Sequence, residues 1–139
     1  AAMELATATT VLAIGVLTGY VEWDPKGFSA VTGLYLLKIV FWTLPLEEAF
    51  FRALIQRYTQ QWLQARTRYA TAISITIASL LFGAAHLHAG AALAVLAAFA
   101  GAGYGLAYVR SGSIEGAFLA HLSLNGLHFL LFTYPRIGS

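Results

Sequence analysis

Residues 91–109 read AALAVLAAFAGAGYGLAYV and contain no charged side chain. A helix that crosses a lipid bilayer needs about 20 consecutive, largely apolar residues, and this stretch reaches that length. Gly101 and Gly105 form a GxxxG pair, the spacing that lets two membrane helices approach each other backbone to backbone. The stretch therefore predicts a transmembrane helix that packs closely against a neighbouring helix.

Apolar stretches of similar character lie on both sides of this one, at about 5–21, 28–46, 69–88 and 114–132. Apolar and polar residues do not alternate with a period of two, and an open sheet in lipid would leave its edges unpaired, so no strand is expected. The sequence predicts an all-α fold, a polytopic transmembrane helix bundle of about five spans. Residues 1–139 are expected to form a single transmembrane domain.

The overall composition favours a membrane protein. Of the 139 residues, 59% are hydrophobic and 10% are charged, whereas soluble domains average roughly 25% charged residues. A small soluble domain cannot bury so much apolar surface, so the surplus is expected to face lipid. The net charge of +2 is not gathered into a basic patch, which argues against a nucleic-acid partner. The lack of cysteine excludes disulfides, thiolate catalysis and cysteine-ligated zinc.

The second apolar stretch continues into a more polar segment at 47–68. Pro45 lies at the junction and is expected to kink or restart the helix, because it lacks an N–H and its ring clashes with the preceding turn. A cluster of arginines in this segment is expected on the cytoplasmic side by the positive-inside rule. Aromatic residues near the ends of the predicted spans fit interfacial positions: Trp23, Trp42, Trp62, Tyr69 and Tyr134.

Polar residues within or beside the apolar stretches are the candidates for function, because a charge placed in hydrocarbon is energetically expensive. They are Lys38, Glu47, Glu48, Arg52, His86, His88, His121, Asn125 and His128. Lys38 is interpreted as a residue that reaches toward the interface or pairs with an acid. His88 lies outside any motif, and His128 is interpreted either as a helix-end residue or as a partner of Asn125, with which it shares a face.

The two adjacent glutamates cannot play the same role, since neighbouring residues on a helix point about 100° apart. Glu48 and Arg52 are spaced i,i+4 and can pair on one face, which would leave Glu47 to face a cavity. The alternative interpretation is an interfacial helix whose charges are solvated. The spacing alone allows either glutamate to be the chemically active one.

His121 and Asn125 are also spaced i,i+4 and therefore share a helix face. Both can donate hydrogen bonds, and two donors that converge on one point are what a developing oxyanion requires. Taken alone, the pair slightly favours a polar contact between membrane helices, and a lone His86 is typical of a packing residue. Together with the glutamates they lie on three predicted helices, where each would be unsatisfied alone, so we expect them to meet. A carboxylate beside a histidine can activate a water molecule.

Three short motifs in these helices resemble those of a known family. Residues 47–52 resemble the EExxxR motif, residues 82–86 the FxxxH motif and residues 121–125 the HxxxN motif. The chain thus resembles the CAAX-processing and bacteriocin-processing (CPBP) intramembrane proteases, which include the eukaryotic CAAX prenyl endopeptidase. The resemblance covers about residues 35–132, with the motifs within 47–125. The chain is short for that family, whose members often carry additional N-terminal helices.

The resemblance implies a glutamate-dependent endopeptidase that needs no metal or other cofactor. It assigns Glu47 as the general base, assisted by His86, and His121 and Asn125 as the oxyanion hole. Glu48 and Arg52 would support these residues as an ion pair: a role also implied by the resemblance. The expected partners are membrane lipid and a protein or peptide substrate with a membrane-associated segment. The Ala-rich, Lys-poor composition favours a bacterial source, and hence the inner (plasma) membrane.

Two other functions remain open from the sequence. A zinc protease would use His86, His121 and a glutamate as ligands, since three such ligands suit a catalytic zinc, although the HExxH motif is absent. A non-proteolytic membrane protein, such as an immunity factor or a scaffold that presents a peptide, would need no catalytic set. Chelation tests the first alternative, and replacement of Glu47 tests the second.

Overall fold

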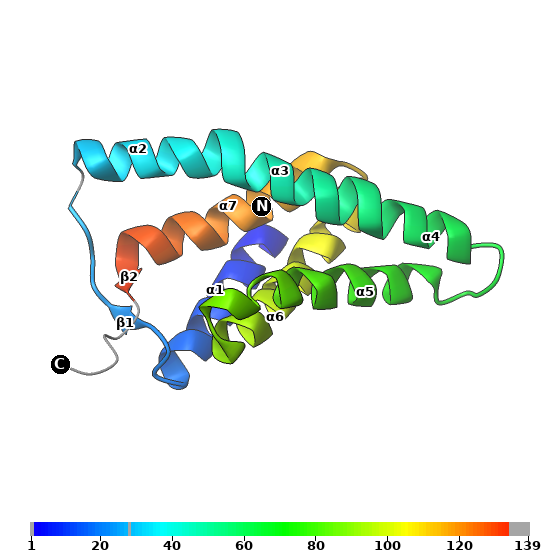
Figure 1. Cartoon of the computed structure of the whole chain (residues 1–139), viewed down its shortest axis with the longest axis horizontal. Helices are drawn as coiled ribbons and strands as arrows, with labels where there is room; N and C mark the ends of the chain where they lie inside the picture. The colour runs from blue at the N-terminus through cyan, green and yellow to red at the C-terminus, as the bar shows by residue number, and fades with distance from the viewer. Residues whose placement is uncertain (1, 28, 134–139) are drawn as a thin grey trace.

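The computed structural model describes residues 2–27 and 29–133. Nearly all of the described chain is helical, as predicted (Figure 1). Phe28, in the predicted second span, and Tyr134, one of the predicted interfacial aromatics, lie outside the described residues. In chain order the main helices are α1 (Ala2–Leu17), a long helix (Ala30–Leu63), α5 (Ala70–Ala85), α6 (Ala91–Ser111) and α7 (Ile114–Leu131).

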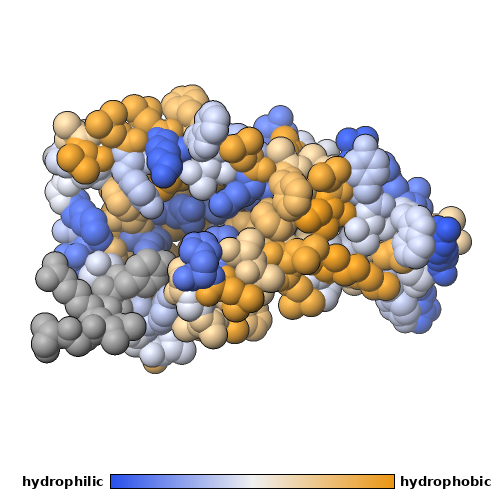
Figure 2. All heavy atoms as spheres, in the orientation of Figure 1, coloured by the Kyte–Doolittle hydropathy of each residue, from blue (hydrophilic) through white to orange (hydrophobic). Residues whose placement is uncertain are grey.

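Two of these helices are long and apolar enough to cross a membrane, the long helix Ala30–Leu63 and α6. Shorter apolar helices span Leu5–Leu17 and Ala70–Ala85. Large apolar side chains of the long helix, among them Phe41 and Trp42, are exposed, and apolar residues cover much of the face seen in Figure 2. A bundle of helices with such a surface suits lipid, and the number of five spans stays a prediction.

The long helix contains two π-helical segments within its otherwise α-helical course. Its segments are α2 (Ala30–Lys38), the π-helical η1 (Ile39–Thr43), α3 (Leu44–Glu48), the π-helical η2 (Ala49–Gln56) and α4 (Arg57–Leu63). Pro45 lies in the first turn of α3, directly after η1, where the N–H of Leu44 bonds to the carbonyl of Ile39. The helix runs on through Pro45 and does not restart there, because the wider π turn carries the chain past the residue without a break, and the alternative of a kink stays a prediction.

The GxxxG pair brings α6 close to its neighbours, as predicted. A Cβ atom on Gly101 would lie 3.3 Å from the Cα of Ser79 on α5. A Cβ atom on Gly105 would lie 2.7 Å from Oε1 of Gln56 on the long helix. The two glycines therefore serve different contacts, one with the α5 backbone and one with a buried polar side chain.

A short strand pair contradicts the expectation of no strand. β1 (Glu22–Trp23) pairs antiparallel with β2 (Phe132–Thr133), and Glu22 lies opposite Thr133. The pairing extends through the N–H of Asp24, which donates to the carbonyl of Leu131 at 2.9 Å. The sequence argument concerned sheets within lipid, whereas these residues belong to the link after α1 and to the end of α7, where backbone groups still need partners.

Candidate active site

Three polar residues of the long helix are completely buried inside the bundle. Glu48, Arg52 and Gln56 each have 0% of their surface exposed. Arg52 Nε donates to Glu48 Oε2 at 3.0 Å, which confirms the pairing expected from their spacing. The guanidinium carbon of Arg52 also lies 5.7 Å from the ring centre of Phe82 and 5.9 Å from that of Tyr104, within the range of cation–π attraction. The buried charge is thus held by one carboxylate and two aromatic rings.

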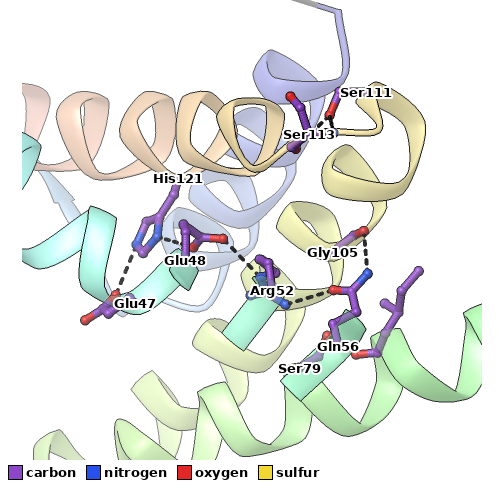
Figure 3. Close-up of polar contacts among 10 residues, drawn as sticks. Glu47, Glu48, Arg52, Gln56, Ser79, Gly105, Ser111, Ser113 and His121 are labelled. Carbon is purple, nitrogen blue, oxygen red and sulfur yellow. Dashed lines mark hydrogen bonds and ion pairs between the residues drawn. The ribbon is translucent and has the colours of Figure 1, made fainter. Parts of the chain in front are cut away.

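His121 on α7 lies between the two adjacent carboxylates (Figure 3). Its Nδ1–H donates to Glu48 Oε1 at 2.7 Å, and its Nε2 lies 3.6 Å from Glu47 Oε2. The ring of Tyr104 stacks on the imidazole, with centroids 4.3 Å apart and planes 19° from parallel. One carboxylate therefore fixes the orientation of the imidazole, while the other faces its second nitrogen.

A cavity of about 390 Å³ opens beside this histidine. All four residues predicted as catalytic line it: Glu47, His86, His121 and Asn125. Glu48 is absent from the lining, because both of its oxygens are engaged with buried partners. Most of the remaining wall is apolar and comes from α1, the long helix, α6 and α7, with Val11, Tyr35, Leu96 and Phe129 as examples. The geometry thus brings together the residues that the sequence placed on three helices.

His86 follows directly after the last residue of α5. Its Nδ1–H donates to the carbonyl of Phe82 at 2.8 Å, and this bond leaves Nε2 as the hydrogen-bond acceptor of the neutral ring. The Phe82 ring contacts both histidines, with its centroid 4.7 Å from that of His86 and 5.6 Å from that of His121. Phe82 of the FxxxH motif thereby supplies both a hydrogen-bond acceptor for His86 and a ring that packs against the two imidazoles.

Asn125 lies one helical turn after His121, and both line the cavity as their shared face predicted. Within the part of the chain that the structure describes, the Asn125 side chain makes no hydrogen bond, so its amide can donate to a bound group. His128 also lines the cavity. His88 bonds to the carbonyl of Ala85 at 3.0 Å and is exposed, and Lys38 is exposed on the long helix.

Two neighbours of the site were not predicted. Gln56 lies eight residues after Glu48 in the polar part of the long helix, and that spacing was a signal that could have been used. Tyr104 lies within an uncharged apolar stretch and carried no signal of its contact with His121.

No group of three His, Asp or Glu side chains among the described residues is arranged to hold a metal ion. His86 and His121 each use Nδ1 in a hydrogen bond, which leaves both Nε2 atoms available, so chelation remains the test of the zinc alternative.

Residues 29–127 match the family described as type II CAAX prenyl endopeptidase Rce1-like. The chain belongs to this family. The matched range contains all three motifs and every residue predicted for the site. No curated protein and no solved structure matches the chain. Family membership, together with the apolar helices, supports a membrane-embedded endopeptidase, a hydrolase of the CAAX-protease type.

Proposed function

We propose that this protein is a glutamate-dependent intramembrane endopeptidase in which Glu47 activates a water molecule. The observation that supports this function best is the meeting of Glu47, His86, His121 and Asn125 at one cavity with apolar walls. A carboxylate and a neutral imidazole that share a water can polarise it, and two further donors can stabilise the oxyanion that forms.

The difference in burial between the two glutamates supports Glu47 as the base. The Glu47 side chain is 29% exposed and lines the cavity, whereas that of Glu48 is 1% exposed and bonds to Arg52 and His121. A base must reach a water molecule and exchange protons with it, and a carboxylate with both oxygens engaged cannot do so. Glu48 instead acts as a positioning residue for His121.

The proposed reaction proceeds through a tetrahedral intermediate. Glu47 removes one proton from the water while the other O–H donates a hydrogen bond to His86 Nε2, and the hydroxide attacks the carbonyl carbon of the peptide bond. The carbonyl oxygen becomes an oxyanion that accepts hydrogen bonds from the Asn125 amide and from His121, whose Nε2 must carry a proton at this step. The carbon–nitrogen bond then breaks as protonated Glu47 gives its proton to the leaving amine.

The cavity also indicates what kind of substrate the enzyme takes. Its apolar lining suits a segment that lies in or against the membrane, and the family is that of the type II CAAX prenyl endopeptidases. The proposed substrate is a protein or peptide with a membrane-associated segment, cleaved at the polar end of the cavity. Membrane lipid surrounds the bundle, and the bacterial inner membrane is the proposed location.

Comparison of membrane proteomes tests this function. Cells that carry Glu47→Gln in place of the wild type are expected to accumulate at least one membrane protein in uncleaved form, because the amide cannot act as a base. Glu22→Gln changes an exposed acid on β1 outside the cavity and is the matched control, with no such accumulation. If Glu47→Gln is expressed normally and the biological function and the proteome stay unchanged, the chain acts without proteolysis, as an immunity factor or a scaffold would.

Metal chelation separates the proposed mechanism from a zinc protease. Cleavage of the accumulated protein in isolated membranes is expected to continue after treatment with EDTA or 1,10-phenanthroline, since the proposed mechanism routes no step through a metal ion. A zinc metalloprotease added to the same membranes should lose its activity and so prove that chelation was complete. Loss of cleavage that added zinc restores would contradict the glutamate mechanism.

A further inference from the structure

Gln56 is completely buried, yet it belongs to none of the three motifs. Its Nε2–H donates to the carbonyl of Gly105 on α6 at 3.0 Å. Its Oε1 accepts from Arg52 Nη1 at 3.5 Å, on the same helix. The side-chain amide is one of the few groups that can offer a donor in one direction and an acceptor in the other.

Gly105 is the counterpart of Gln56 on α6. A Cβ atom at this position would lie 2.7 Å from Gln56 Oε1 and 3.4 Å from Arg52 Nη1. No side chain fits there unless the glutamine or the arginine moves. At Gly101, the other glycine of the pair, the nearest atoms instead belong to Phe82 and Ser79. One motif therefore contains a glycine (Gly105) that limits the positions of Gln56 and Arg52 and a glycine (Gly101) that contacts neither.

These contacts join α6 to α7 through the long helix (Figure 3). In order, the groups are the carbonyl of Gly105, Gln56, Arg52, Glu48 and His121. We propose that Gln56 and Gly105 are positioning residues that hold Arg52 against Glu48 Oε2, so that Glu48 Oε1 stays free to fix the imidazole of His121. We call this set the buried relay. The expected effect of the relay on catalysis rests on the proposed function. Its expected effect on the position of His121 does not.

The chemistry of the amide explains why glutamine occupies the position. Methionine has a similar length but offers neither hydrogen bond, so it releases Arg52 without emptying the space. Glutamate would place an acceptor against the Gly105 carbonyl and a second carboxylate beside Arg52, in competition with Glu48. Both Gln56→Met and Gln56→Glu are therefore expected to disturb His121, although Gln56 does not line the cavity.

Nitrogen NMR of the histidine side chains tests the relay without any substrate. The full chain, labelled with ¹⁵N-histidine, is purified in detergent, and the His121 signals are assigned by their loss in His121→Gln. Gln56→Met is expected to shift the Nδ1 signal of His121 and to leave that of exposed His88 unchanged. An unmoved His121 signal in folded Gln56→Met protein would overturn the proposal.

The two glycines provide a matched pair for the same measurement. Both substitutions crowd α6, with the nearest atom at 2.7 Å for Gly105→Ala and at 3.3 Å for Gly101→Ala. Gly105→Ala meets Gln56 Oε1 directly, whereas Gly101→Ala reaches His121 only through the Phe82 ring, so Gly105→Ala is expected to give the larger shift of His121. Equal shifts in the two variants would mean that helix packing in general, and not the relay, controls the histidine. Gly105→Ala also replaces Gln56→Met as the test if the methionine variant does not fold.

A kinetic measurement connects the relay to catalysis. With the protein that accumulates in Glu47→Gln cells as substrate, Gln56→Met is expected to lower kcat about 10-fold, the loss typical of one hydrogen bond to a charged group. KM should stay unchanged, because Gln56 lies outside the cavity. An altered KM with unchanged kcat would contradict a positioning role. If His121 shifts but Glu47→Gln has no effect on proteolysis, the relay stands and the proposed function fails.

Discussion

Replacement of Arg52 by methionine is expected to lower the free energy of unfolding by about 3–5 kcal/mol, the usual effect of leaving one member of a buried ion pair alone. The Arg52 and Glu48 side chains are at most 1% exposed and are joined at 3.0 Å. Without the arginine, His121 is the one hydrogen-bond partner that Glu48 keeps among the described residues. Chemical denaturation in detergent micelles, followed by circular dichroism, measures the change.

A double variant separates the cost of the lone charge from the loss of chemistry. Glu48→Leu combined with Arg52→Met removes both charges, and apolar replacements of a buried pair are often neutral for stability. The double variant is expected to recover most of the lost stability and to remain inactive, because His121 has lost the carboxylate on its Nδ1. Glu47→Gln, at the neighbouring and partly exposed position, should change stability little. A double variant less stable than Arg52→Met alone would contradict the ion-pair account.

Replacement of Asn125 by alanine is expected to lower kcat by about 10²–10³, the typical effect of removing one donor from an oxyanion hole. KM should change little, because this hydrogen bond forms mainly in the transition state. Asn125→Asp keeps the size of the side chain but removes its N–H groups, so it should be equally impaired. The measurement is steady-state cleavage of the protein that accumulates in Glu47→Gln cells.

Ser123 provides the control for this prediction on the same helix. Its hydroxyl bonds to the carbonyl of Leu119 at 2.8 Å, and the residue does not line the cavity. Ser123→Ala is expected to keep wild-type kcat and KM. If Asn125→Ala and Ser123→Ala had the same activity, Asn125 would have no part in an oxyanion hole.

The features that could be predicted from the sequence depend on regular local spacing. The i,i+4 rule gave the pairing of Glu48 with Arg52, and the helix face shared by His121 and Asn125 placed both at one cavity. The apolar stretches predicted the helices, and the GxxxG pair predicted the close packing of α6 against its neighbours. These patterns need no knowledge of how distant parts of the chain meet.

The features that were missed are contacts between distant residues. Glu48 and His121 lie 73 positions apart, and no local pattern specifies which oxygen meets which ring nitrogen. Tyr104 was hidden within an apolar stretch, although its ring packs against the site. The strand pair joins the link after α1 to the residues that follow α7, and it depends on tertiary packing that brings α1 beside α7. The roles of the site residues and the number of spans stay predictions.

The π-helical segments have a consequence for the angular phase of the long helix. In an α-helix, residues four apart drift by about 40° around the axis with each step. A π turn contains more residues than an α turn, so four residues fall short of a full turn. A π turn between α turns therefore offsets the drift of residues four apart. Tyr35, Ile39, Thr43 and Glu47 line one cavity across η1, and Glu48, Arg52 and Gln56 are buried together across η2. Deleting one residue from η1 would turn Tyr35 away from the face of Glu47, and deleting one from η2 would turn Gln56 away from the face of Glu48.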